Sequence, residues 1–210
     1  MTETPDKPLL FVVDDDEAVR DSLEALLGNK GYNIRTFDSG KKFLDDIDGL
    51  AQQACLLLDI RMPGLDGLKV LDRLTDKKLP LAVIMITGHA DVSIAVRAMK
   101  AGATDFIEKP FTQNVILTAV AKAFESLNDA ELPAADKREI INKLNNLTPR
   151  ERDVFSRLVD GLTNKEIARE LEISPRTVEV YRAGVMDKMG ARNLSSLVKM
   201  GLAAGLGTEL

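Results

Sequence analysis

The first part of the chain alternates short apolar runs with amphipathic segments. The apolar runs, most of them rich in Val, Ile or Leu, predict β-strands at Leu9–Val13, Asn33–Phe37, Cys55–Leu58, Ala82–Ile86 and Asp105–Ile107. Apolar residues at helical spacing predict helices between them at about Glu17–Leu27, Lys41–Ile47, Gly67–Thr75, Val92–Ala101 and Gln113–Leu127. Five strand–helix repeats predict a doubly wound α/β domain over residues 1–127, with a parallel sheet covered by helices on both faces.

Residues 128–146 have a different composition, with a proline and many charged side chains. Their second half carries a helical stripe of apolar residues, Ile140, Ile141 and Leu144. This pattern predicts a linker that is partly helical. The stripe is compatible with packing on either neighbouring domain or with pairing to a second protomer.

Residues 147–210 are entirely helical in pattern and predict an all-α domain of four helices. Two helix starts lie close together within it. Thr163, followed three residues later by Glu166, predicts a capping box, and Ser174–Pro175 predicts an N-cap followed by proline at the first helical position. The two residues Glu172–Ile173 between these helices permit only a tight helix-turn-helix crossing.

Polar residues follow the predicted strands at their carboxyl ends. Asp14 and Asp15 follow the first strand, Asp59 the third, Thr87 the fourth, and Lys109 comes soon after the fifth. Because a doubly wound sheet binds ligands at this edge, the three carboxylates are expected to share one cleft. Carboxylates that lie close together are stabilised by a bound cation, and a set of ligands made up only of oxygen atoms suits Mg²⁺. A carboxylate beside such a metal can form an aspartyl phosphate, whose oxygens the hydroxyl and the ammonium can hold.

Some polar or reactive residues have plainer interpretations. An Asp pair after a strand is by itself more often a helix cap, and Asp15 or Asp16 is suited to that role. The single histidine, His89, is expected to be a solvated loop residue. The single cysteine, Cys55, lies in an apolar run and is expected to be a small core side chain in a reducing compartment.

Residues 9–125 resemble the receiver domain of response regulators. The resemblance rests on four stretches in the expected order, Phe11–Asp16, Leu58–Gly67, Ile86–His89 and Phe106–Phe111. It implies a flavodoxin-like sheet of order 2-1-3-4-5.

The same resemblance implies a role for each polar residue of the cluster. Asp59 would accept a phosphoryl group from a sensor histidine kinase, and Thr87 and Lys109 would bind the phosphoryl oxygens. Asp14, Asp15 and Asp59 would hold Mg²⁺ together with the backbone carbonyl of Arg61. Phe106 would be the switch aromatic residue. The Lys109–Pro110 peptide bond is expected to be cis.

Two helices joined by a tight turn are by themselves more often a packing unit than a DNA reader, but the pattern is compatible with DNA as the partner of the second domain. Such a domain places its second helix in the major groove, where Arg reads guanine and apolar side chains meet thymine methyl groups. Helix starts can hold phosphate groups. The residues expected to contact DNA are Lys165, Arg176, Thr177, Glu179, Val180 and Arg182. On the opposite side of the second helix, Val178, Val185 and Met189 are expected to be core.

Residues 147–205 resemble the LuxR-type helix-turn-helix domain, over the stretches Leu147–Arg152, Gly161–Ala168 and Ile173–Arg182. The whole chain therefore resembles the NarL/FixJ family of two-component response regulators. It departs from that pattern at Tyr181, where histidine is common, and at Gly184. A glycine inside a helix costs about 1 kcal/mol relative to alanine.

The resemblance implies a phosphorylation-controlled transcription factor. Phosphorylation of Asp59 would draw Thr87 inward and let Phe106 rotate. A homodimer would then form through the helix at 92–101 and the strand at 105–107, and would bind double-stranded DNA. No enzymatic activity is expected beyond phosphorylation and dephosphorylation of the receiver itself.

Composition narrows the setting of this activity. The chain lacks an apolar stretch near the roughly 20 residues of a membrane span, and its first residues lack a signal pattern, so no membrane association and a cytoplasmic location are expected. The net charge is -5, whereas residues 145–210, with 10 basic and 9 acidic side chains, carry a net charge of +1.

Two other functions stay open at this level. One is an aspartyl-phosphate enzyme that hydrolyses a small phosphoester at Asp59. The other is a phosphorylation-dependent module whose helical domain binds protein or RNA, which the weak positive charge of residues 145–210 allows.

Overall fold

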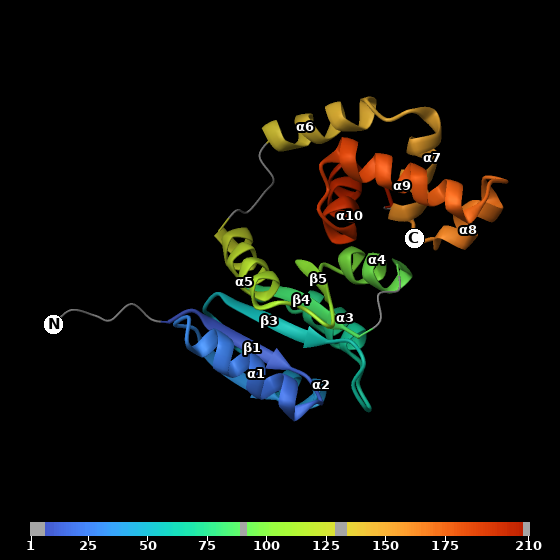
Figure 1. Ribbon diagram of the computed structural model, residues 1–210. Helices are drawn as coiled ribbons and strands as arrows, with labels where there is room; N and C mark the ends of the chain where they lie inside the picture. Colours follow the sequence, from blue (N-terminus) through green and yellow to red (C-terminus); the bar gives the residue numbers. More distant parts are fainter. Residues whose placement is uncertain (1–6, 89–91, 129–133, 208–210) are drawn as a thin grey trace. The chain divides into compact units, whose positions relative to one another are not determined.

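The computed structural model describes residues 7–88, 92–128 and 134–207 of the 210-residue chain. These residues form two compact units (Figure 1). One unit holds the described residues up to 88 and those from 101 to 128, and the other holds 92–100 and 134–207. The helix α4 (Val92–Lys100) thus groups with the second unit, although it lies between two strands of the sheet in chain order.

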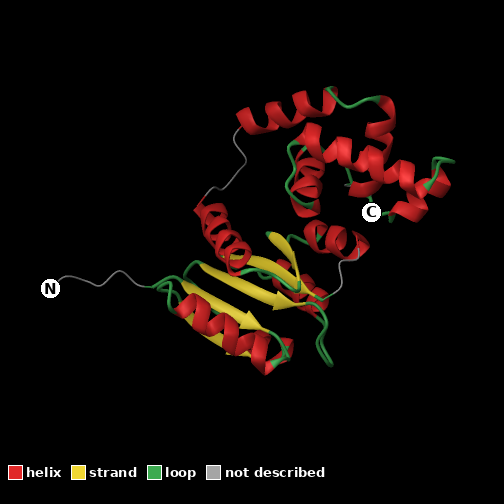
Figure 2. Cartoon of the chain, in the orientation of Figure 1, coloured by secondary structure: helices red, strands yellow, loops and turns green. Residues whose placement is uncertain are grey.

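The first unit is built on a five-stranded sheet in which all neighbouring strands are parallel (Figure 2). Its strands are β1 (Leu9–Val13), β2 (Asn33–Phe37), β3 (Ala54–Asp59), β4 (Leu81–Thr87) and β5 (Asp105–Glu108). The order β2-β1-β3-β4-β5 confirms the expected fold class. The strands lie where the apolar runs predicted them. β3 and β4 are each one residue longer at both ends, so that they include Asp59 and Thr87, and β5 is one residue longer at its end.

Helices of the first unit pack on both faces of the sheet. They are α1 (Glu17–Gly28), α2 (Gly40–Asp46), α3 (Gly67–Thr75) and α5 (Gln113–Asn128). Because side chains alternate along a strand, Leu10 and Val12 join one core cluster with residues of α1 and α5. Phe11 points to the other face, where its ring meets that of Phe43 from α2 at a centroid distance of 5.4 Å.

The core of the first unit also contains the single cysteine. Cys55 is fully buried, as predicted, and burial raises the pKa of its thiol, so this side chain is inert. The interpretation of His89 as a loop residue falls outside the described residues. In the described part of the chain, no helix is both long enough and apolar enough to span a bilayer.

The helices of the second unit include the four that were predicted for the carboxy-terminal part of the chain. They are α7 (Pro149–Val159), α8 (Asn164–Glu170), α9 (Pro175–Met189) and α10 (Leu194–Ala203), preceded by α6 (Ala134–Asn145). Thr163 and Glu166 form the predicted capping box at α8, and Ser174 caps α9. The buried residues Val178, Val185 and Met189 confirm the predicted core face of α9.

The helix α6 belongs to the hydrophobic core of the second unit. Ile140 and Leu144 pack against that core, and the Arg152 guanidinium donates a hydrogen bond to the Leu144 carbonyl at 2.8 Å. Ile141, the third residue of the apolar stripe, is 50% exposed. The structure therefore places Ile140 and Leu144, two of the three residues of the stripe, on the helix-turn-helix domain.

We expect Ile140→Ala to lower the unfolding free energy of the second unit by about 1–2 kcal/mol, because it removes partly buried methyl and methylene groups. The matched variant Ile141→Ala removes the same atoms from an exposed position and should change that free energy by less than about 0.5 kcal/mol. Amide hydrogen exchange of α7 and α9 in the full chain measures both effects. Equal losses of protection in the two variants would contradict the packing of α6.

Candidate functional site

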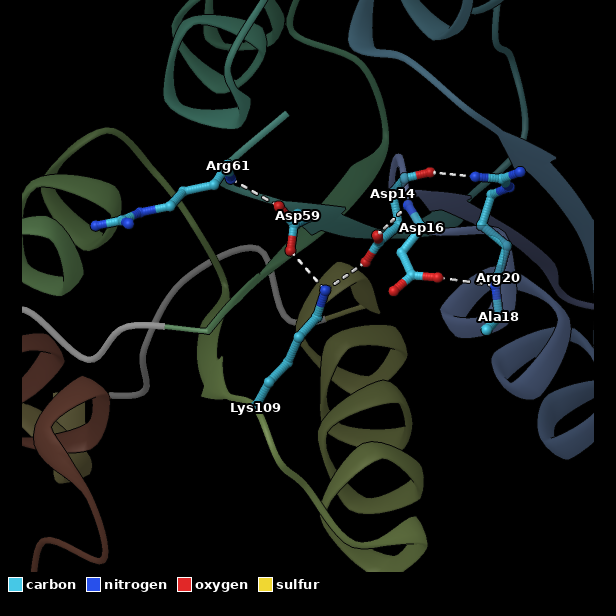
Figure 3. A network of polar contacts seen from close by, with 7 residues as sticks. All are labelled: Asp14, Asp16, Ala18, Arg20, Asp59, Arg61 and Lys109. Atoms are coloured by element: carbon cyan, nitrogen blue, oxygen red, sulfur yellow. Dashed lines mark hydrogen bonds and ion pairs between the residues drawn. The ribbon is translucent and has the colours of Figure 1, made fainter. Parts of the chain in front are cut away.

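Two buried carboxylates meet on either side of one ammonium group at the carboxyl end of the sheet (Figure 3). The Nζ atom of Lys109 lies 2.6 Å from Asp14 Oδ2 and 2.7 Å from Asp59 Oδ1. The register of β1 and β3 explains this arrangement, because Val13 pairs with Leu58 and the next residue on each chain segment is an aspartate. The expected convergence of the first and third strand ends is thus present for Asp14 and Asp59.

Lys109 is held in place by the end of the neighbouring strand. Its backbone N–H donates to the Thr87 carbonyl at 2.7 Å, and the Lys109–Pro110 peptide bond is cis, as the resemblance implied. Thr87 is fully buried as the last residue of β4. Phe106 is half-buried on β5.

The remaining oxygens of the two carboxylates accept hydrogen bonds from the backbone. Asp59 Oδ2 accepts from the Arg61 N–H at 2.6 Å, and Asp14 Oδ1 accepts from the Asp16 N–H at 3.0 Å. The Arg20 guanidinium donates to the backbone carbonyl of Asp14 at 2.7 Å. Both carboxylates are therefore oriented through each of their oxygens (Figure 3).

Burial and charge act against one another in this cluster. Burial raises the pKa of the Asp14 carboxyl above its usual value, although hydrogen bonds from Lys109 and Asp16 oppose the rise. Burial also tends to lower the pKa of the Lys109 ammonium, but its hydrogen bonds to Asp14 and Asp59 raise it overall. With all three groups charged, the cluster has one negative charge in excess. An additional cation would stabilise the ionised carboxylates.

The oxygen atoms of this cluster suit magnesium. Mg²⁺ is usually bound by one or two carboxylates and completes its shell with water and phosphate oxygens, so the donors of Asp14 and Asp59 fit it. Asp15 is exposed. Within the described ranges, no group of three or more His, Cys, Asp or Glu side chains is arranged to hold a metal ion. Asp16 instead caps α1, since its side chain accepts from the Ala18 N–H at 2.9 Å.

Gly67 is a residue of the site to which the sequence reasoning assigned no role. A Cβ atom at this position would lie 2.2 Å from the backbone carbonyl oxygen of Asp59. Its N–H donates to the Ile60 carbonyl at 2.9 Å, which joins the start of α3 to the end of β3. The available signals were a glycine at the first position of a predicted helix and its place at the end of the Leu58–Gly67 stretch.

The predicted DNA-contacting residues differ in their exposure. Lys165, at the start of α8, is exposed, as are Arg176 and Glu179 on α9, and Val180 is 67% exposed. Thr177 is half-buried in the first turn of α9 and its N–H donates to the Ser174 hydroxyl at 3.0 Å. Among the described residues, Val180 is the most exposed large hydrophobic side chain, ahead of Ile141 at 50% and Val115 at 46%.

Arg182 lies away from that exposed face. It is half-buried, and its Nη1 atom is 3.5 Å from the Asn164 side-chain oxygen at the start of α8. This contact joins the two helices of the helix-turn-helix. The structure therefore brings Arg176, Glu179 and Val180 onto one surface and turns Arg182 toward α8.

Comparison with known proteins identifies both parts of the chain. The family described as "Response regulator receiver domain" matches residues 10–121, and "Bacterial regulatory proteins, luxR family" matches residues 145–201. Transcriptional regulatory protein FixJ of Bradyrhizobium diazoefficiens is 45% identical over 197 residues, which cover 94% of this chain and 96% of that protein. The chain belongs to the NarL/FixJ family of response regulators.

Solved structures of related response regulators agree with this assignment. A crystal structure of full-length FixJ from B. japonicum is 45% identical, covers 95% of this chain and 98% of its own, and has a TM-score of 0.54. The beryllofluoride-activated NtrC4 receiver domain dimer is 36% identical and covers 57% of this chain and 98% of its own, with a TM-score of 0.54. The luxR-family match begins at residue 145, which is the last residue of α6. Almost all of α6 therefore lies outside the matched region, although α6 packs on the second unit.

Proposed function

We propose that this response regulator is a transcription factor controlled by phosphorylation of Asp59. A sensor histidine kinase would supply the phosphoryl group, and phosphorylation would promote homodimerisation and specific binding to double-stranded DNA. The observation that carries this proposal is the shared contact of Asp14 and Asp59 with Lys109 at the carboxyl end of the sheet. The relative FixJ, a transcriptional regulatory protein, supports transcription as the output.

The phosphoryl transfer uses groups that are already in place. A carboxylate oxygen of Asp59 attacks phosphorus, the new P–O bond forms, and the P–N bond of the kinase phosphohistidine breaks with its electron pair leaving on nitrogen. The Arg61 N–H keeps the Asp59 carboxylate oriented. The Lys109 ammonium and the Thr87 hydroxyl would then bind the phosphoryl oxygens. The catalytic activity of the protein is confined to its own phosphorylation and dephosphorylation.

The transfer would require Mg²⁺, held by Asp14, Asp15, Asp59 and the backbone carbonyl of Arg61. The bound ion would supply neutralisation of negative charge around the phosphoryl group. Asp14 is suited to this role because its carboxylate is buried and shares a single ammonium group, that of Lys109, with Asp59. Asp15 offers an exposed carboxylate next to it in the chain.

The phosphorylated site would act on the receiver surface through Thr87 and Phe106. Movement of Thr87 toward the phosphoryl group would free space for Phe106 to rotate, which favours dimerisation through α4 and β5. The activated NtrC4 receiver, which is a dimer, supports this response. In functional terms we divide the chain into a receiver (1–127), a linker (128–146) and a DNA-binding domain (147–210), acting on DNA in the cytoplasm.

The DNA-binding domain would place α9 in the major groove. Val180 would meet a thymine methyl group there, and Arg176 and Thr177 would hold phosphate at the start of the helix. The complete set of proposed contacts is Lys165, Arg176, Thr177, Glu179, Val180 and Arg182. For Arg182, binding DNA requires release of its contact with Asn164.

We expect beryllofluoride with Mg²⁺, which mimics the phosphorylated state, to convert the full chain from monomer to dimer and to raise its affinity for operator DNA at least tenfold. The operator would be selected from a random library, and binding followed by fluorescence anisotropy at several salt concentrations. Affinity should fall steeply with salt, since phosphate contacts dominate binding. If activation changed neither the molar mass of the protein in solution nor its affinity for the operator, phosphorylation control would be refuted.

A further inference from the structure

The carboxylate of Glu151 joins the start of α7 to the flank of α9. Its Oε2 atom accepts hydrogen bonds from the Thr148 N–H at 2.7 Å and from the Thr148 hydroxyl at 2.9 Å, which completes a capping box. The same atom lies 2.7 Å from Lys188 Nζ on α9. Hydrogen bonds from Lys188 and Thr148 lower the pKa of Glu151 to about 2, so this largely buried side chain stays ionised.

The other oxygen of Glu151 explains the glycine at position 184. A Cβ atom on Gly184 would lie 2.8 Å from Glu151 Oε1, and both of the nearest atoms to that Cβ belong to Glu151. Three hydrogen bonds, two from Thr148 and one from Lys188, hold the Oε2 atom of this carboxylate, so moving the carboxylate away from a new Cβ would disturb them. Gly184 is unfavourable for the helix alone, and the carboxylate occupies the space that its missing side chain leaves.

Gly184 and Lys188 lie one turn apart on α9 and follow Val180 at intervals of four residues, so the three form a stripe that borders the core face. Val178, Val185 and Met189 face the core, whereas Arg176 and Val180 face outward. Glu151 is buried and contacts α9 only at its flank, so it does not belong to the outward surface. This contact is one of the points at which α9 meets α7, beside the packing of Val178, Val185 and Met189 in the core.

We propose that Glu151 is a positioning residue for the recognition helix, and that Gly184 and Lys188 are the two points on α9 through which it acts. Side-chain contacts with base edges depend on the placement of the recognition helix and carry the sequence information, whereas phosphate contacts bind DNA of any sequence. The trio therefore sets the discrimination between operator and other DNA rather than DNA affinity in general. This inference rests on the proposed function, because it takes α9 as the helix that reads DNA.

The test is a double-mutant cycle in the full chain, activated with beryllofluoride and Mg²⁺. For each variant, Kd is measured for the selected operator and for a scrambled duplex of the same length at the same salt concentration. We expect Gly184→Ala to lower the ratio of specific to non-specific affinity at least tenfold, with non-specific affinity within twofold of wild type. In the Glu151→Ala background, adding Gly184→Ala should change the ratio by less than twofold, because the atoms that meet the new Cβ are gone.

A third variant tests the same contact without introducing a steric clash that could unfold the domain. Lys188→Met removes the ammonium without adding bulk near Glu151, and we expect it to lower the specificity ratio about threefold while leaving the scrambled-duplex Kd unchanged. The inference is wrong if Gly184→Ala has the same effect in both backgrounds, or if specific and non-specific affinity fall together in all variants. A wild-type protein that binds operator no better than scrambled DNA would instead overturn the proposed function.

Discussion

Asp59→Asn is expected to abolish phosphorylation and to hold the DNA affinity of the regulator at its unactivated level. The amide has nearly the same shape as the carboxylate and can still accept the Arg61 N–H, so the fold should be retained. It lacks the negative charge and the nucleophilic oxygen that attack on phosphorus requires. Intact-mass measurement after incubation with acetyl phosphate and Mg²⁺ should show one added phosphoryl group on wild type and none on the variant.

An exposed aspartate provides the matched control for this result. Asp45→Asn makes the same chemical change on α2, away from the cluster, and should leave phosphorylation and DNA affinity as in wild type. Appearance of a stable phosphoryl group on the Asp59→Asn variant would rule out Asp59 as the acceptor. Loss of phosphorylation in both variants would point to a general effect of charge.

Gly67→Ala is expected to lower the unfolding free energy of the receiver by about 3 kcal/mol, at the upper end of the cost of overpacking. The new Cβ would lie 2.2 Å from the Asp59 carbonyl oxygen and 3.0 Å from Ile60 Cα, and backbone atoms cannot rotate away as a side chain can. Relief of the clash must separate α3 from the end of β3 and displace Asp59. Urea unfolding followed by circular dichroism measures the loss, and phosphorylation by acetyl phosphate should slow in parallel.

A glycine-to-alanine substitution at the end of α1 provides the control. Gly28 is the last residue of α1, and a Cβ there would meet only the Ile34 side chain, at an ordinary distance of 3.8 Å. Gly28→Ala should therefore be neutral or stabilising by up to about 1 kcal/mol. Equal stability of the two alanine variants would show that the approach of α3 to β3 is not a tight constraint.

The sequence alone was sufficient for the elements of the fold and for two of the carboxylates in the site. Strands are identified by their apolar runs, and the alternation of Leu10 and Phe11 already implies two covered faces. Asp14 and Asp59 were predictable together because both follow parallel strands at the same edge of a sheet, a relation that depends on topology and not on fine geometry. The caps of α8 and α9 were also predictable, because each is formed by residues that lie close together in the chain.

Only the tertiary structure decided the contacts between segments that are distant in the chain. The packing of α6 on the second unit, the carbonyl of Asp59 against Gly67, and the carboxylate of Glu151 against Gly184 belong to this group. In each case a difference of a few tenths of an ångström determines whether a side chain fits, and sequence periodicity carries no information at that scale. Periodicity tells which face of an element is buried, while the identity of the atoms it meets is set by the packing of the whole core.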